Sequence, residues 1–166
     1  CQLVDKFCEY WPGLDSFNVH DDWGAQDGPF FNPRVVNEML VPYMRRVTDH
    51  IHSLGYTCDL HSCGKIEKLI PCIIDAGWDA WDGMVINDYS AIYAEYGDKL
   101  IMQVPVFDCP ADADTATQIA SADRFADEFV IKDKPACFAG NGAFAPIFDF
   151  QKELYKSSRI KFSEGN

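Results

Sequence analysis

The stretch NPRVVNEMLVPYMRRVTDHIHSLGYTCDLHSCG, residues 32–64, decides the fold of this chain. Asn32 is suited to cap a helix and Pro33 to its first turn, and apolar residues then recur every three or four positions. The members of this apolar stripe are Val36, Leu40, Met44, Val47, Ile51 and Leu54. Gly55 is suited to end the helix in a left-handed cap, and residues 56–60 are typical of a strand. The stretch therefore predicts one long helix followed by one strand.

The same alternation of short apolar runs with helical patterns continues on both sides of this stretch. Upstream, residues 2–9 indicate the end of a helix and residues 17–20 a short strand. Downstream, the pattern predicts helices at 66–74, 90–96, 115–129 and 148–160, and strands at 80–85, 100–107 and 136–139. Strict alternation of strands and helices favours right-handed βαβ units and a parallel sheet.

The length of the chain bears on which parallel fold this is. Five strand–helix units in 166 residues take about 33 residues each, so eight units would need about 265, close to the ~250 of a closed barrel. We therefore expect the C-terminal five βα units of a TIM (β/α)8 barrel, as a single partial domain over residues 1–166 with the N-terminal units absent. An open doubly wound parallel sheet is the alternative, although the chain lacks the Gly-x-Gly-x-x-Gly fingerprint of dinucleotide-binding sheets.

Composition restricts the partners and the location of the protein. Asp and Glu total 26 against 14 Lys and Arg, a net charge of −12, which disfavours nucleic acid and anionic membranes as partners. No apolar run approaches the ~20 residues of a spanning helix. The seven cysteines are odd in number and irregularly spaced, which argues against a disulfide scaffold and favours reduced thiols in a cytoplasmic protein.

Polar residues collect where each predicted strand ends. Acids, thiols, imidazoles and glycines occupy the segments 20–29, 61–65, 81–88, 108–110 and 140–142. In a (β/α)8 barrel the carboxyl ends of the strands carry the working residues, so these segments predict an active rim. By contrast, we expect His50 and His52, on the long helix, to lie on a solvated face.

The pair His61 and Cys63 is the sharpest feature of this rim. Residues i and i+2 at the end of a strand point to the same face, so one imidazole and one thiol can converge on a metal. Nitrogen and sulfur donors with an open position are typical of catalytic zinc, which binds a thiol or polarises an oxygen of a substrate. The spacing therefore predicts a Zn²⁺ site here.

Several motifs resemble those of one enzyme superfamily. They are Asp22-Trp23-Gly24, Gly28-Pro29-Phe30-Phe31, Asn32-Pro33, Leu40-Val41-Pro42-Tyr43, His61-Ser62-Cys63-Gly64 and Tyr96-Gly97-Asp98-Lys99. With them the chain resembles the uroporphyrinogen decarboxylase superfamily, and within it the corrinoid-dependent zinc methyltransferases more than the decarboxylases. The resemblance covers essentially the whole chain, as the C-terminal part of that barrel.

The resemblance implies a ligand set for the zinc ion. His61 and Cys63 match two ligands of the zinc methyltransferases directly. The third ligand of that branch, a cysteine, falls near Gly140-Asn141-Gly142, where this chain has neither that cysteine nor the histidine of the decarboxylases. Cys137 is the first substitute and Asp22 the second, with Asp108 also able to offer a carboxylate oxygen.

The resemblance also implies an activity, a zinc-dependent methyltransferase of the demethylase type. It would move a methyl group between a small methylated compound or thiol and a cobalamin held by a separate corrinoid protein, and a homodimer is possible. Asp21, Asp22 and Asp82 are candidate catalytic residues that position substrate or handle a proton. Candidate substrate contacts are Trp23, Gln26 and Asn141.

Two other functions stay open. Uroporphyrinogen decarboxylase, of porphyrin biosynthesis, takes a substrate with many carboxylates, but this part of the rim offers only Lys65 and Arg34 to meet them. The chain could also be a non-catalytic barrel fragment that acts through assembly with another polypeptide.

Overall fold

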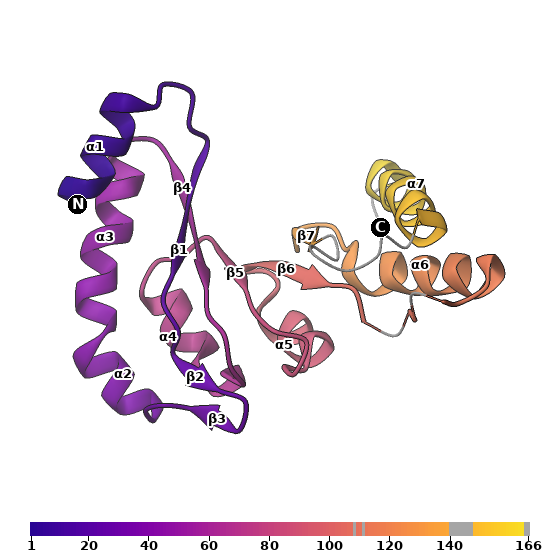
Figure 1. Ribbon diagram of the computed structural model, residues 1–166, viewed down its shortest axis with the longest axis horizontal. Helices are drawn as coiled ribbons and strands as arrows, with labels where there is room; N and C mark the ends of the chain where they lie inside the picture. Colours follow the sequence, from indigo (N-terminus) through magenta and orange to yellow (C-terminus); the bar gives the residue numbers. More distant parts are fainter. Residues whose placement is uncertain (108, 111, 140–147, 165–166) are drawn as a thin grey trace. The chain divides into compact units, whose positions relative to one another are not determined.

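The computed structural model describes residues 1–107, 109–110, 112–139 and 148–164. These residues divide into two compact units, Cys1–Asn87 and Asp88–Asn166 (Figure 1). Each unit alternates parallel strands with helices, as the sequence pattern predicts. Within the described residues the strands with parallel partners number five, three in the first unit and two in the second.

The first unit is built on three parallel strands, β1 (Ser16–His20), β4 (Thr57–His61) and β5 (Ala80–Asp82), in the order β1-β4-β5. Their register pairs His20 with His61, and His61 with Asp82. The last residues of all three strands thus form one row across the sheet, which places their side chains on a common edge.

The long helix predicted from Pro33 onward is two helices, α2 (Pro33–Met39) and α3 (Val41–Ser53). The interpretation as one helix is wrong because Pro42 has no N–H and cannot continue the hydrogen-bond ladder of α2. The predicted ends hold: the Asn32 side chain accepts a hydrogen bond from the backbone N–H of Val35 at 3.1 Å, and Gly55 adopts a φ of 86°. Val36 and Ile51 of the apolar stripe are buried, and Leu54 is exposed.

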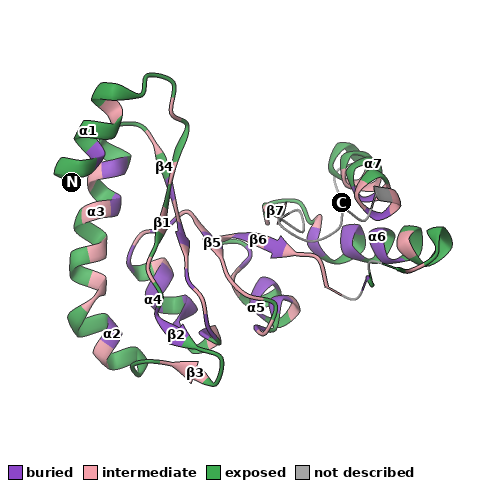
Figure 2. Cartoon of the chain, viewed as in Figure 1, coloured by how far each residue is buried: buried purple, intermediate pink, exposed green. Residues whose placement is uncertain are grey.

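Two helices, a 3₁₀ turn and a two-stranded hairpin complete the first unit. The helix predicted over 66–74 is a 3₁₀ turn, η1 (Glu67–Leu69), followed by α4 (Ile70–Asp75), and α1 (Gln2–Tyr10) covers the helix end predicted at 2–9. A two-stranded antiparallel hairpin, β2 (Gly24–Ala25) and β3 (Gly28–Pro29), lies in the loop after β1. Figure 2 shows buried residues on α4 and β4, with exposed residues along α1 and α3.

The second unit contains two parallel strands, β6 (Ile101–Pro105) and β7 (Ala136–Ala139), and three helices among its described residues. The helices are α5 (Tyr89–Tyr96), α6 (Thr115–Phe129) and α7 (Phe148–Glu164). The bounds of α6 and β7 agree with the sequence prediction, while β5 and β6 are shorter and α7 is longer. Phe125 packs against Phe107, Phe129 and Phe150, which ties α6 to its neighbours in this unit.

No helix among the described residues is both long enough and apolar enough to cross a membrane. All seven cysteines are unpaired thiols, as the odd number and irregular spacing predict. The single partial domain stays a prediction.

Candidate metal centre

The row of strand ends in the first unit carries the predicted zinc ligands. His61 is the last residue of β4, and Cys63 follows two residues later, so both belong to the carboxyl edge of the sheet. The Nε2 atom of His61 lies 3.4 Å from the Sγ atom of Cys63. A sulfur at ~2.3 Å and a nitrogen at ~2.0 Å from a tetrahedral zinc ion would lie about 3.5 Å apart. The two side chains therefore already have the separation that zinc ligands need.

A third donor joins this pair from the loop after β1. One ligand atom each from Asp22, His61 and Cys63 lies within 4.8 Å of the other two, and we call these residues the carboxyl-end cluster. The Oδ1 atom of Asp22 accepts a hydrogen bond from the backbone N–H of Cys63 at 2.8 Å. This bond holds the pKa of the Asp22 carboxyl below its usual range. Asp22 is therefore an anionic oxygen donor beside the nitrogen and the sulfur.

The surroundings of the Cys63 thiol favour its protonated form. Burial raises its pKa, and the nearby Asp22 carboxylate, followed by that of Asp82, raises it further. A bound cation would reverse this preference, because a coordinating thiol gives up its proton to the solvent. The donor set of one nitrogen, one sulfur and one carboxylate is thus chemically suited to Zn²⁺.

Asp82 lies behind His61 rather than beside the sulfur. Its Oδ2 atom is 3.0 Å from the Nδ1 atom of His61, because β4 and β5 pair these two residues in register. A carboxylate on Nδ1 keeps the imidazole proton there and turns the Nε2 lone pair outward, toward Cys63. Asp82, predicted as a catalytic residue, is therefore placed to orient and polarise a ligand.

Close backbone packing fixes the loop that carries Cys63. Gly64 has a φ of 97°, and a Cβ at this position would lie 2.3 Å from the carbonyl carbon of Gly24. The Ser62 hydroxyl accepts a hydrogen bond from the backbone N–H of Trp23 at 2.9 Å and donates to the Cys63 carbonyl at 3.1 Å. Glycine at position 64 thus allows the loops after β1 and β4 to touch, which brings Asp22 to Cys63.

A buried amide ties the loop after β4 to the loop after β5. The side-chain N–H₂ of Asn87 donates to the carbonyls of Gly64 and Met84, each at 2.9 Å. Its carbonyl oxygen accepts from the backbone N–H of Ile66 at 2.8 Å. One side chain therefore satisfies three backbone groups and holds the segment behind Cys63 in place.

The sequence analysis placed His20 in the rim segment 20–29 but assigned it no role in the site. Its ring stacks on that of His61 with 4.5 Å between the centroids. The signal that could have found it is register, because His20 ends β1 as His61 ends β4. His20 is exposed, so its ring lies between His61 and the solvent-exposed surface of the unit.

The other predicted site residues have different positions. Asp21 accepts a hydrogen bond from the Nε1–H of Trp23 at 3.0 Å, and Trp23 is itself only 2% exposed. Gln26 lies exposed in the turn between β2 and β3. Cys137 lies on β7 of the second unit with an exposed side chain, and its role as third ligand stays a prediction. Asn141 and Asp108 lie outside the described residues.

A hollow in the second unit contains none of these candidates. It has a volume of about 520 Å³ and lies over the end of α6, β7 and α7. Its lining is mostly apolar and includes Phe129, Ile131, Phe138 and Phe162. The chemistry-bearing residues described above gather instead at the carboxyl edge of the first unit.

Comparison with known proteins supports the fold. No protein-family model matches the chain, and no curated protein matches it. A solved structure of a methyltransferase from Methanosarcina mazei superposes with a TM-score of 0.60 over 89% of the chain, at 16% sequence identity. The match covers 42% of that methyltransferase, so the chain spans less than half of its length. The likeness confirms the predicted fold class, a mixed α/β fold with parallel strands like part of a (β/α)8 barrel, in a methyltransferase-like form.

Proposed function

We propose that the chain belongs to a zinc-dependent methyltransferase of the demethylase type, which moves a methyl group between a small methylated compound or thiol and a corrinoid protein. The observation that carries this proposal is the convergence of His61 Nε2 and Cys63 Sγ, 3.4 Å apart, at the carboxyl edge of a parallel sheet. This edge is where barrel enzymes hold their reacting groups. The methyltransferase-like fold supports the same assignment.

His61, Cys63 and either Asp22 or Cys137 would hold the zinc ion. When bound, zinc supplies a Lewis acid that lowers the pKa of a thiol or polarises an oxygen at its open position. Asp82 keeps the imidazole proton of His61 on Nδ1, so that Nε2 is free to bind. The hydrogen bond from the Cys63 backbone keeps Asp22 ionised, which leaves it able to act as a ligand or to accept a substrate proton.

Methyl transfer is compatible with the acidity of this edge. A methyl group moves as a cation equivalent, from the sulfur or oxygen of a small substrate to the cobalt of a corrinoid carrier, or the reverse. Asp21 accepts a hydrogen bond from the Trp23 indole and the His20 ring stacks on His61, so these side chains are candidates to contact a substrate. A corrinoid protein as partner and a cytoplasmic location, which the seven free thiols favour, belong to the same proposal.

The charge of the edge favours this function over porphyrinogen decarboxylation. Asp22 belongs to the carboxyl-end cluster, and Asp21 and Asp82 both contact His61. Each is an acid that would repel the carboxylates of a porphyrinogen. Lys65, the cation nearest in sequence, lies 3.8 Å from Glu67 and is half exposed. The described part of the edge is therefore poorly matched to a polycarboxylate.

The zinc content of the purified protein and of two variants tests the proposal. We expect His61→Ala and Cys63→Ala each to lose the zinc bound at the carboxyl edge, measured by mass spectrometry of the metal per protein. His50→Ala and Cys72→Ala are matched controls. His50 pairs with Asp5 at 2.7 Å on α3, and Cys72 is buried on α4, so neither variant should lose metal. Zinc binding that both site variants retain in full would overturn the proposal.

Transfer activity is tested with free cobalamin as the probe. Reduced cobalamin is mixed with methylated thiols or methoxylated compounds, and the formation of methylcobalamin is followed by its absorbance. We expect transfer that His61→Ala and Cys63→Ala abolish and that the two control variants retain. Transfer at the same rate in the site variants would show that this edge is not the reacting site.

A further inference from the structure

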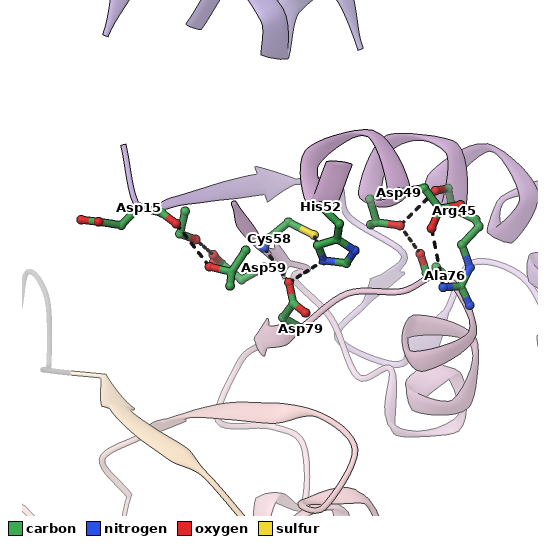
Figure 3. A network of polar contacts seen from close by, with 11 residues as sticks. Asp15, Arg45, Asp49, His52, Cys58, Asp59, Ala76 and Asp79 are labelled. Atoms are coloured by element: carbon green, nitrogen blue, oxygen red, sulfur yellow. Dashed lines mark hydrogen bonds and ion pairs between the residues drawn. The ribbon is translucent and has the colours of Figure 1, made fainter. Parts of the chain in front are cut away.

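A second group of metal-binding side chains lies at the opposite end of β4. His52 is in the last turn of α3, Cys58 is the second residue of β4, and Asp79 directly precedes β5. One ligand atom from each lies within 4.8 Å of the other two, and we call these residues the amino-end cluster. Figure 3 shows the three side chains turned toward one another between the helix and the two strands.

The distance between the histidine and the cysteine of this cluster is close to that of two zinc ligands. The Nε2 atom of His52 is 3.6 Å from the Sγ atom of Cys58, against about 3.5 Å for a nitrogen and a sulfur on tetrahedral zinc. The same Nε2 atom is 2.8 Å from the Oδ2 atom of Asp79. This second distance is that of a hydrogen bond and is shorter than the roughly 3.3 Å between a nitrogen and an oxygen on tetrahedral zinc, so the Asp79 side chain would move away slightly when an ion binds.

The backbone around this cluster is rigid. Asp79 Oδ2 also accepts a hydrogen bond from the backbone N–H of Cys58 at 2.8 Å, and the backbone N–H of Asp79 donates to the Cys58 carbonyl at 2.9 Å. Cys58 is 1% exposed, so its sulfur is held by packing in one position. Preorganised donors of this kind lose little conformational freedom when they bind an ion.

The exposure of the three side chains leaves a path for the ion. His52 and Asp79 are about one-third exposed, at 37% and 34%, while the Cys58 sulfur is covered. An ion could enter from the side of the imidazole and the carboxylate, and a water molecule could complete its coordination there. The charge of the bound ligands, one thiolate and one carboxylate, would balance that of a divalent cation.

We propose that His52 Nε2, Cys58 Sγ and the Asp79 carboxylate form a second zinc site, separate from the carboxyl-end cluster and structural in role. Zinc is the divalent ion that suits one nitrogen, one sulfur and one carboxylate oxygen in a tetrahedral arrangement. The site joins the end of α3 to the starts of β4 and β5. In a (β/α)8 barrel this amino end of the strands serves stability rather than catalysis.

Binding changes the protonation of two groups. The Cys58 thiol gives up its proton to the solvent and becomes a thiolate, and the imidazole of His52 carries its proton on Nδ1 so that Nε2 can bind. The hydrogen bond between His52 Nε2 and Asp79 is replaced by a bond from each to the metal. No electrons are transferred in this step.

The test uses the His61→Ala/Cys63→Ala protein, in which the carboxyl-end cluster has lost two donors. After dialysis against zinc and removal of free metal, we expect this protein to retain about one zinc per chain. Adding His52→Ala should remove it, whereas adding His50→Ala, a change two residues away on the same helix, should leave it in place. Circular dichroism of each variant verifies that the protein is folded.

Binding of Co²⁺ tests whether the Cys58 sulfur is a ligand. In the same background, Co²⁺ should give a thiolate-to-metal charge-transfer band that Cys58→Ser abolishes and Cys72→Ser, at another buried cysteine, does not. If Cys58→Ser fails to fold, loss of zinc in His52→Ala is the deciding test. The His52 side chain is partly exposed, so its removal should leave the fold intact.

Two results would overturn the proposal: a background protein that binds no zinc, or bound zinc that His52→Ala does not release. The proposed function fails separately. If the unaltered protein loses zinc with His52→Ala but not with His61→Ala or Cys63→Ala, the amino-end site stands and the carboxyl-end site does not.

Discussion

The two ends of β4 hold the same three kinds of donor in different surroundings. The histidine–cysteine distance is 3.4 Å at the carboxyl end and 3.6 Å at the amino end. At the carboxyl end the carboxylate of Asp82 binds the far side of the His61 ring, and Cys63 is half-buried. At the amino end Asp79 binds the near side of the His52 ring, and Cys58 is buried.

This difference shows that donor identity alone does not assign a role to a metal-binding group. The carboxyl-end cluster has a supporting carboxylate behind its histidine and an accessible sulfur, which suits exchange of ligands with a substrate. The amino-end cluster directs all its donors inward and covers its sulfur, which suits a fixed ion. The following predictions test whether the two ends differ in this way.

Gly64→Ala should have the largest effect on stability. The substitution directly disturbs only the carboxyl-end cluster. The φ of 97° disfavours alanine, and the new Cβ would lie 2.3 Å from backbone of Gly24. We expect a loss of about 3 kcal/mol in the free energy of unfolding, measured by urea denaturation. Gly13→Ala is the control, because Gly13 has a φ of 92° with nothing within 4 Å and should cost only about 1 kcal/mol. Equal losses would mean that the contact between the two loops is unimportant.

Asp82→Ala should weaken zinc at the carboxyl end without removing its ligands. Loss of the carboxylate on His61 Nδ1 frees the ring to rotate, and we expect a roughly 10- to 100-fold lower affinity. Competition with a chromophoric chelator measures the zinc affinity. The measurement uses protein that also carries His52→Ala, so that only the carboxyl-end cluster contributes. Asp49→Ala, at an exposed carboxylate 4.0 Å from Arg45, is the control. If Asp82→Ala leaves the zinc affinity unchanged, Asp82 does not support His61 as a ligand.

Alkylation should distinguish the two sulfurs in metal-free protein. Burial raises the pKa of Cys58 to about 12, with the Asp79 carboxylate adding to the rise, and the side chain is 1% exposed. Cys63 is half-buried, so it should react with iodoacetamide at least about ten-fold faster at neutral pH. Peptide mass spectrometry after timed quenching measures both rates, with the exposed Cys1 as the reference. Similar alkylation rates at Cys58 and Cys63 would contradict the inference that the Cys63 sulfur is more accessible than the Cys58 sulfur.

Asp22→Asn should have the smallest effect, visible as a change in pH dependence. The hydrogen bond from Cys63 lowers the pKa of the Asp22 carboxyl in the folded protein, so the ionised group stabilises the fold above its ordinary pKa. That contribution is lost as the pH falls below about 3.8 and through the lowered value. Unfolding midpoints of metal-free protein at several pH values should therefore differ between Asp22→Asn and the unaltered chain near neutrality and converge in acid. A constant difference would show that the charge on Asp22 is not involved.

Much of the fold could be predicted because its elements carry strong local signals. The Asp114 side chain caps α6 by accepting a hydrogen bond from the backbone N–H of Thr117, and the helix begins and ends where its apolar pattern does. The break at Leu40 could not be predicted from periodicity, since the apolar stripe runs through it and only Pro42 opposes the longer helix. The β2–β3 hairpin has two residues per strand, too few for any alternation to appear.

The carboxyl-end cluster could be predicted in part for the same reason. His61 and Cys63 are two residues apart, so the geometry of one strand brings them together. Asp22 and Asp82 come from other loops, and their separate contacts with Cys63 and His61 depend on the register of three strands. His52 was expected on a solvated face, and its contacts with Cys58 and Asp79 depend on how α3 packs against the sheet.

The hydrogen bonds of Asn87 constrain the lengths of two loops. Because one amide bonds to Gly64, Ile66 and Met84, the loops after β4 and β5 are joined through the Asn87 side chain. An insertion or deletion in either loop would detach the other, so these two loops are expected to keep their lengths together. Segments without such a link, such as the turn at Gly13, are where added residues would be tolerated.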